Sequence, residues 1–217
     1  MTGAPKRPVR PRDAASLVIL RGSGEGTEVL MGKRARRHKF MPDMYVFPGG
    51  RLDREDRFAP VLRDLPEKPL ARLSNQFGEE TARGLAVAAA RETWEETGLV
   101  LGEVREQGLH ADLSGMDYLA RAITPPPSPI RFHARFFVVD AERVQGGPGA
   151  PLGGSGELLD LAFRPIQEAL AMPIADVTEF VLEEVMRRIR GTSIEAVPIF
   201  SYQNNAPIIR YQHLDRQ

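Results

Sequence analysis

Clusters of glycine and proline divide this chain into short segments, and this division constrains the fold more than any other feature. The 20 glycines and 18 prolines make up about 17% of 217 residues, against a usual roughly 12%. Between the clusters, short apolar and β-branched runs predict strands. The predicted strands are 14–21, 28–33 with 44–47 as its partner, a strand from Leu99, 132–140 and 157–163, and the tail at 194–211 alternates enough for one or two more.

Two segments have the composition and spacing of helices. Residues 84–97 are rich in Ala, Glu, Leu and Arg, and Gly98 follows where a helix stop is expected. Residues 177–189 place apolar side chains at the spacing of an amphipathic helix, and 165–171 predicts a short helical turn. Because strands and helices alternate without regular βαβ spacing, we expect an α/β fold with a mixed sheet flanked by helices.

Composition excludes several classes of protein. The absence of cysteine excludes a disulfide framework, a thiolate nucleophile and a zinc site with cysteine ligands. The 29 Lys and Arg residues balance 29 Asp and Glu residues, which argues against a nucleic-acid partner. The apolar runs are far shorter than the roughly 20 residues that span a bilayer. We therefore expect a cytoplasmic protein without a membrane partner, with one domain at 13–217 after a disordered arm at 1–12.

The segment from Arg91 to Leu99 carries most of the chemical information. On a helix, Glu92, Glu95 and Glu96 fall within roughly a 100° arc. Like charges at this spacing repel by a few tenths of a kcal/mol, and anions at a helix C-terminus cost roughly 0.3–1 kcal/mol each. A divalent cation removes both penalties, and oxygen-only ligands favour Mg²⁺ or Mn²⁺ over zinc. The alternative is a solvated acidic helix face.

In its context this segment resembles the signature of the Nudix hydrolase family, G-x5-E-x7-R-E-U-x-E-E-x-G-U, where U is an aliphatic residue. The matching residues are Pro48-Gly49-Gly50 at the entry to the first half, and Arg91-Glu92, Glu95-Glu96 and Gly98-Leu99 in the second half. Thr93 replaces an aliphatic residue. From Gly50 to Leu99 is 49 positions where the signature has 22, so about 27 residues are inserted.

The resemblance implies a Nudix α/β/α sandwich, in which a mixed curved sheet lies between helices. We expect an inserted lobe with short helices at about 57–83, inside the motif, and a C-terminal extension at about 190–217. The insertion leaves three candidates for the acid of the first half. Asp56 stands at the nominal distance from Gly50, and Asp53 and Glu55 are rivals.

The resemblance also implies a reaction, the hydrolysis of a nucleoside diphosphate linked to another moiety. It implies that Glu95 and Glu96 bind Mg²⁺ or Mn²⁺, that Glu92 is a third ligand or a base for water, and that Arg91 orients Glu95. Such an ion neutralises developing charge and lowers the pKa of a bound water. Glu157, after the glycine-rich loop at 146–156, is the candidate general base. The alternative is that Glu157 only begins a strand.

A split motif of this kind is similar to that of the peroxisomal coenzyme A diphosphatases of animals and their bacterial relatives. The stretches that carry this similarity are 40–42 with 46–53, 123–125 and 131–137. A coenzyme A signature, L-L-T-x-R-S-x3-R-x3-G-x3-F-P-G-G, aligns without gaps from Leu30 to Gly50. Arg34 and Phe47 to Gly50 match it, whereas Lys39 and four other positions do not.

A dense basic segment at 34–39 lies next to the Pro-Gly-Gly turn. Coenzyme A carries a 3′-phosphate that Arg or Lys side chains would recognise. The predicted substrate-binding residues are Arg34, Lys39, Phe47, Gly49 and Gly50. A solvated hairpin loop is the alternative for any single basic residue, and Arg131 and Arg135 are alternative phosphate contacts.

Three functions remain open from the sequence. The first is a hydrolase that cleaves coenzyme A or its acyl esters to 3′,5′-ADP and a 4′-phosphopantetheine product. The second keeps this chemistry but acts on ADP-ribose, a dinucleotide or a nucleoside-diphosphate sugar. The third is a non-catalytic module that senses a nucleotide. In each case the partner is a small nucleotide, and the strand-forming tail allows a homodimer.

Overall fold

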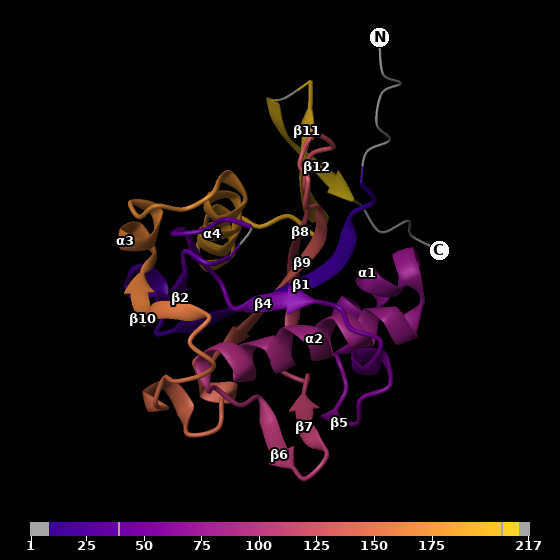
Figure 1. The fold of residues 1–217 in the computed structure, drawn as a ribbon, viewed down its shortest axis with the longest axis vertical. Coiled ribbons are helices and arrows are strands. Elements are labelled where there is room, and N and C mark those ends of the chain that lie inside the picture. The colour runs from indigo at the N-terminus through magenta and orange to yellow at the C-terminus, as the bar shows by residue number, and fades with distance from the viewer. Residues whose placement is uncertain (1–8, 39, 205, 213–217) are drawn as a thin grey trace.

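The main sheet has nine strands and lies between two layers of helices (Figure 1). The computed structural model describes residues 9–38, 40–204 and 206–212. Within these residues the strand order is β10-β2-β1-β9-β8-β11-β12, with β3 paired to β2 and β4 paired to β1. The strands of this sheet are β1 Arg12–Arg21, β2 Glu28–Arg34, β3 Tyr45–Val46, β4 Gly49–Arg51, β8 Asp117–Ile123, β9 Phe132–Asp140, β10 Leu158–Pro165, β11 Val197–Gln203 and β12 Ala206–Gln212.

Strand β1 is an interior strand of the sheet, paired along both of its edges. It runs parallel to β9, and its other edge is shared between β4 and β2, which are both antiparallel to it. Leu17 and Ile19 face one core of the protein, whereas Val18 and Leu20 face the other, because successive side chains of a strand alternate. Both faces of β1 are therefore buried, which explains its nearly continuous apolar sequence.

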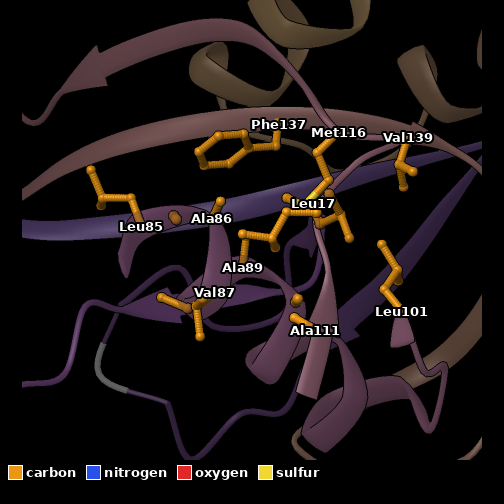
Figure 2. Packing of buried hydrophobic residues seen from close by; sticks show 14 of the residues in the cluster. Leu17, Leu85, Ala86, Val87, Ala89, Leu101, Ala111, Met116, Phe137 and Val139 are labelled. Carbon is orange, nitrogen blue, oxygen red and sulfur yellow. The ribbon is translucent and has the colours of Figure 1, made fainter. Parts of the chain in front are cut away.

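Helix α2 (Glu79–Thr97) covers one face of the sheet together with α1 (Glu67–Phe77). Its Leu85 and Ala89 lie in one buried cluster with Leu17 of β1 and Phe137 of β9 (Figure 2). Helices α3 (Ile166–Leu170) and α4 (Asp176–Ile189) cover the other face and bury a second cluster. The predicted fold class, an α/β/α sandwich around a mixed sheet, is confirmed.

The predicted insertion at 57–83 forms β5 (Val61–Arg63), α1 and the first turn of α2. Its Leu65 and Leu73 are buried in the same cluster as α2. Strand β5 joins a second, three-stranded sheet with β7 (Gly108–Asp112) and β6 (Gly102–Arg105). Helix α2 thus begins earlier than the predicted residue 84, because two glutamates in its first turn stabilise the positive end of the helix dipole.

Three further boundaries differ from the sequence-based expectation. Strand β1 begins at Arg12, inside the predicted arm at 1–12, of which residues 1–8 lie outside the described residues. No strand begins at Leu99 among the described residues: Gly98 ends α2 in the left-handed conformation, and β6 begins only at Gly102. The predicted strand at 44–47 is reduced to β3, so β2 pairs mainly with β10.

The C-terminal strands extend the sheet at one edge. Strand β11 pairs with β8 in parallel at Ile199 and Phe200, and β12 pairs with β11 along its whole length. The hairpin projects beyond the helical layers (Figure 1). The expectation of one or two strands in the tail is confirmed. Within the described part of the chain, no helix has both the length and the hydropathy needed to cross a membrane.

We expect Phe137→Ala to lower the free energy of unfolding by about 3–5 kcal/mol, because its removal leaves a cavity between β9 and α2. Its side chain is fully buried, whereas that of Val104 on β6 is 47% exposed. Urea unfolding measures both variants, and Val104→Ala should change the free energy by less than about 0.5 kcal/mol. Similar losses in the two variants would contradict the assignment of Phe137 to the core.

Candidate active site

A cavity of about 690 Å³ opens between the C-terminal half of α2 and the start of α4. Its lining combines carboxylates of α2, glycines of β4, aromatic side chains of β9 and β11, and the first residues of α4. Of the described residues that line it, none belongs to 54–90, so the inserted segment contributes no side chain. The predicted site residues in the lining are Arg34, Phe47, Gly49, Gly50, Arg91, Glu92, Glu95, Glu96 and Glu157.

Two glycines of β4 allow the backbone to lie against the acidic side chains of α2. Gly49 has a φ of 155°, and a side chain there would collide with the backbone of Ala15 and Ser16. A Cβ atom at Gly50 would collide with the Glu92 carboxylate. The Pro-Gly-Gly turn therefore makes room for the carboxylates.

Glu96 is the most deeply buried of the acids that line the cavity, with 4% of its surface exposed. Its Oε2 accepts a hydrogen bond from the Gly49 amide at 2.9 Å. Burial raises the pKa of Glu96 to about 7, although the Gly49 amide and the charge of Arg34 oppose the shift. A nearby cation would favour the charged form, so this position suits a ligand of a divalent ion.

Arg91 joins the two halves of the split motif. Its Nε and Nη2 donate to the two carboxylate oxygens of Asp56 at 2.8 and 3.0 Å. Its Nη1 lies 3.0 Å from Glu92 Oε1 and 3.3 Å from Glu95 Oε2. Burial acts to lower the pKa of Arg91, but the hydrogen bonds and charges of Asp56 and Glu92 outweigh it and raise the pKa. The guanidinium is therefore always charged, and it orients both Glu92 and Glu95.

Among the three candidate acids of the first half, Asp56 is the one that is buried. Both of its oxygens are occupied by Arg91, and Oδ2 also accepts a hydrogen bond from the Asp53 amide at 2.8 Å. The Asp53 side chain is half exposed and lies 3.7 Å from Arg91 Nη2, and Glu55 is exposed. The acid at the nominal spacing from Gly50 is thus the partner of Arg91.

The three glutamates of α2 do not converge on one point. Among the described residues, no group of three His, Cys, Asp or Glu side chains is arranged to hold a metal ion. Burial also raises the pKa of Glu92, against the opposing charge of Arg91. The oxygen-only donor set fits Mg²⁺ or Mn²⁺, and in this structure Glu92 and Glu95 both lie within hydrogen-bond distance of Arg91.

Of the predicted basic segment, Arg34 lines the cavity, and its Nη2 lies 3.1 Å from His38 Nδ1. Arg36 instead pairs with Asp43 at 2.9 Å, and the predicted substrate-binding residue Lys39 lies outside the described residues. The alternative contacts Arg131 and Arg135 do not line the cavity. Arg135 is fully buried and donates to Asp13 at 2.6 Å, and Arg131 donates to the Thr124 carbonyl at 3.0 Å. These two alternatives are therefore wrong.

The predicted residue Phe47 lines the cavity from the core, where its ring meets Phe136 edge to face at 6.3 Å between centroids. Glu157 is exposed and immediately precedes β10, so it lines the cavity without belonging to the strand. Its charge also raises the pKa of Glu96, which places the two acids near one another.

Sequence reasoning missed the part of the cavity that β11 and α4 form. Phe200 and Tyr202 of β11 and Asp176 of α4 line it, and the Tyr202 hydroxyl donates to Asp176 Oδ2 at 2.9 Å. Burial and this contact raise the pKa of Tyr202 to about 12, so the hydroxyl remains a donor at neutral pH. In the sequence, the tail at 194–211 shows only an alternation of apolar and polar residues, and it contains no motif that would place it beside the cavity.

Removal of Asp56 tests the ion pair that joins the halves of the motif. Asp56→Ala should lower the free energy of unfolding by about 3 kcal/mol, because it leaves the Arg91 charge without its buried partner. Glu55→Ala removes the adjacent exposed acid and should change this free energy by less than about 0.5 kcal/mol. Chemical denaturation compares the two, and equal stability of both variants would show that Asp56 does not anchor Arg91.

No family model matches the sequence, and no curated protein matches it. Solved structures do match. A Nudix hydrolase from Alicyclobacillus acidocaldarius is 26% identical, with a TM-score of 0.60 over 81% of this chain and 90% of that chain. The Nudix domain of Shewanella oneidensis NrtR, solved in complex with ADP ribose, is 15% identical, with a TM-score of 0.53 over 87% of this chain and 99% of that chain.

A MutT protein from Bacillus halodurans has a TM-score of 0.53 at 12% identity, over 91% of this chain and 97% of that chain. The last two likenesses concern the fold alone, whereas the first also extends to the sequence. Together with the glycine turn and the acidic helix around one cavity, the first of these neighbours supports the assignment of the chain to the Nudix superfamily and to its hydrolases.

Proposed function

We propose that this chain hydrolyses coenzyme A or acyl-coenzyme A to 3′,5′-ADP and the corresponding 4′-phosphopantetheine product. The observation that carries the proposal is the buried carboxylate of Glu96, which accepts a hydrogen bond from the Gly49 amide and lines the same cavity as Arg34. A buried acid in a cavity that also contains a cationic side chain is suited to a metal ion that is bound together with phosphate oxygens.

In this proposal Glu95, Glu96 and Glu92 hold Mg²⁺ or Mn²⁺. The ion, when bound, neutralises charge on the diphosphate and lowers the pKa of the attacking water. Arg91 orients Glu92 and Glu95 through its hydrogen bonds. Glu157 is the proposed base, since its carboxylate lines the same cavity and makes no ion pair with any described residue.

Two features support a nucleotide of the size of coenzyme A. The cavity volume of about 690 Å³ lies within the roughly 300–1,000 Å³ of typical ligand sites. Phe132 and Tyr202 line the cavity, are partly exposed and offer aromatic side chains on which an adenine ring can stack. Arg34 lines the cavity with a cationic side chain. We propose that it contacts the 3′-phosphate.

Hydrolysis by the α2 carboxylates is tested by Glu95→Gln and Glu96→Gln. Each variant should lower kcat by at least about 100-fold with Mg²⁺ or Mn²⁺, because a neutral amide is a poor ligand for a hard cation. The control Glu80→Gln changes an exposed acid in the first turn of the same helix and should leave kcat unchanged. Near-normal turnover in both site variants would remove the metal role of these residues.

The substrate is tested with coenzyme A, dephospho-coenzyme A, ADP-ribose, NADH and nucleotide sugars, with products identified by mass spectrometry. Release of 3′,5′-ADP from coenzyme A supports the proposal, preference for ADP-ribose points to the second class of substrate, and inactivity on every compound points to a nucleotide sensor.

Arg34→Ala should lower kcat/KM about tenfold more for coenzyme A than for dephospho-coenzyme A, because one charge-assisted contact is lost. Arg36→Ala, outside the cavity, is the control, and equal losses for the two substrates would exclude the 3′-phosphate role.

A further inference from the structure

The glycine-rich loop at 146–156 closes on the end of the helix that carries the acidic side chains. The last carbonyl groups of an α-helix have no partners within the helix and must find them elsewhere. Here the Ser155 amide donates to the Glu95 carbonyl and the Gly153 amide donates to the Thr97 carbonyl, both at 2.7 Å. The loop therefore holds the backbone of the turn that contains Glu95 and Glu96.

Gly154, between these two donors, lies directly against the helix backbone. Its φ is 110°, which favours glycine, and a Cβ atom there would collide with the carbonyl group of Glu96 and lie 2.7 Å from the Thr97 nitrogen. These are backbone atoms of a packed helix, so they cannot move aside as a flexible side chain can. Any residue other than glycine at this position must push the loop and the helix end apart.

The other end of the loop is fixed to the opposite part of the cavity. The Glu157 carbonyl accepts a hydrogen bond from the Ala35 amide at 3.3 Å, and Leu158 pairs with Arg34 where β10 joins β2. Residues 154–157 thus link the contact with the Glu96 backbone to β10, which pairs with β2 at Arg34. The position of the loop on α2 sets the position of Glu157 relative to Glu96.

We infer that Gly154 is a positioning residue of the active site. Its missing side chain allows the loop to bind the last turn of α2, which fixes the carboxylates of Glu95 and Glu96 and holds Glu157 in the same cavity. This inference rests on the proposed function, in which these carboxylates bind a divalent ion. Loss of an outer contact to metal ligands typically lowers metal affinity by about 10–100-fold, and a shift of about 1 Å in a catalytic group lowers the rate by about 100-fold.

The neighbouring glycine provides a matched control. Gly153 lies in the same loop, but its φ is not in the left-handed region, and a Cβ atom there would have no atom within 4 Å. Gly153→Ala therefore adds the same methyl group one residue away without touching α2. A difference between the two alanine variants reports the contact with the helix and not the general flexibility of the loop.

The experiment titrates Mn²⁺ alone into the wild-type protein and the two variants, and it measures kcat and KM for coenzyme A and the midpoint of thermal unfolding. We expect Gly154→Ala to weaken Mn²⁺ binding by about tenfold and to lower kcat by about 10–100-fold, with a smaller change in KM. Gly153→Ala should stay within about twofold of the wild type in both quantities. Both variants should unfold within a few degrees of the wild type.

Mn²⁺ affinity and kcat that are equal in Gly154→Ala and Gly153→Ala would overturn the inference while leaving hydrolysis intact. Conversely, a wild-type protein that binds Mn²⁺ but hydrolyses no diphosphate would overturn the proposed function, and the Mn²⁺ titration would still decide the role of Gly154. If Gly154→Ala does not fold, Ser155→Pro replaces it, since this change removes the amide that binds the Glu95 carbonyl. Wild-type Mn²⁺ affinity in a folded Ser155→Pro variant overturns the inference, and a loss of about tenfold supports it.

Discussion

The ion pair between Arg91 and Asp56 holds together a motif that the chain itself divides. The two residues are 35 positions apart, and the intervening segment adds a helix, a strand and the first turns of α2 to the core. Breaking such a pair leaves an uncompensated buried charge, which is costly. Because the same guanidinium contacts Glu92 and Glu95, the pair also sets the orientation of the acidic side chains. The inserted residues can therefore lengthen the chain between Asp56 and Arg91 while the two residues, and the glutamates that Arg91 contacts, remain together.

Two glycines, Gly50 and Gly154, allow groups of the site to pack where a side chain would otherwise lie. A side chain at Gly50 would occupy the position of the Glu92 carboxylate, and a side chain at Gly154 would occupy that of the Glu96 backbone. The first glycine admits the acidic group from the side of the sheet, and the second admits the loop at the end of the helix. In both places the absence of a side chain lets a neighbouring group pack directly against the glycine backbone, and this close packing holds the group in position.

The cavity joins an acidic end to an aromatic wall that comes from distant parts of the chain. The acids belong to α2, whereas Phe200 and Tyr202 belong to β11, which reaches the cavity by extending the sheet beyond β8. The acidic end suits the chemistry that diphosphate hydrolysis requires. The wall formed by β11 and α4 is the part that can distinguish one nucleotide derivative from another, since its aromatic faces are suited to a base.

The sequence alone determined the local elements and the local chemistry. The acidic helix, its stop at Gly98 and the Pro-Gly-Gly turn follow from residue type and spacing, because caps, turns and helix faces are properties of neighbouring residues. Only the tertiary structure decided that Asp56, rather than Asp53 or Glu55, binds Arg91, that Arg135 is buried away from the cavity, and that β11 completes the site. Contacts between residues far apart in the chain depend on how the sheet is ordered, and neither spacing nor periodicity encodes that order.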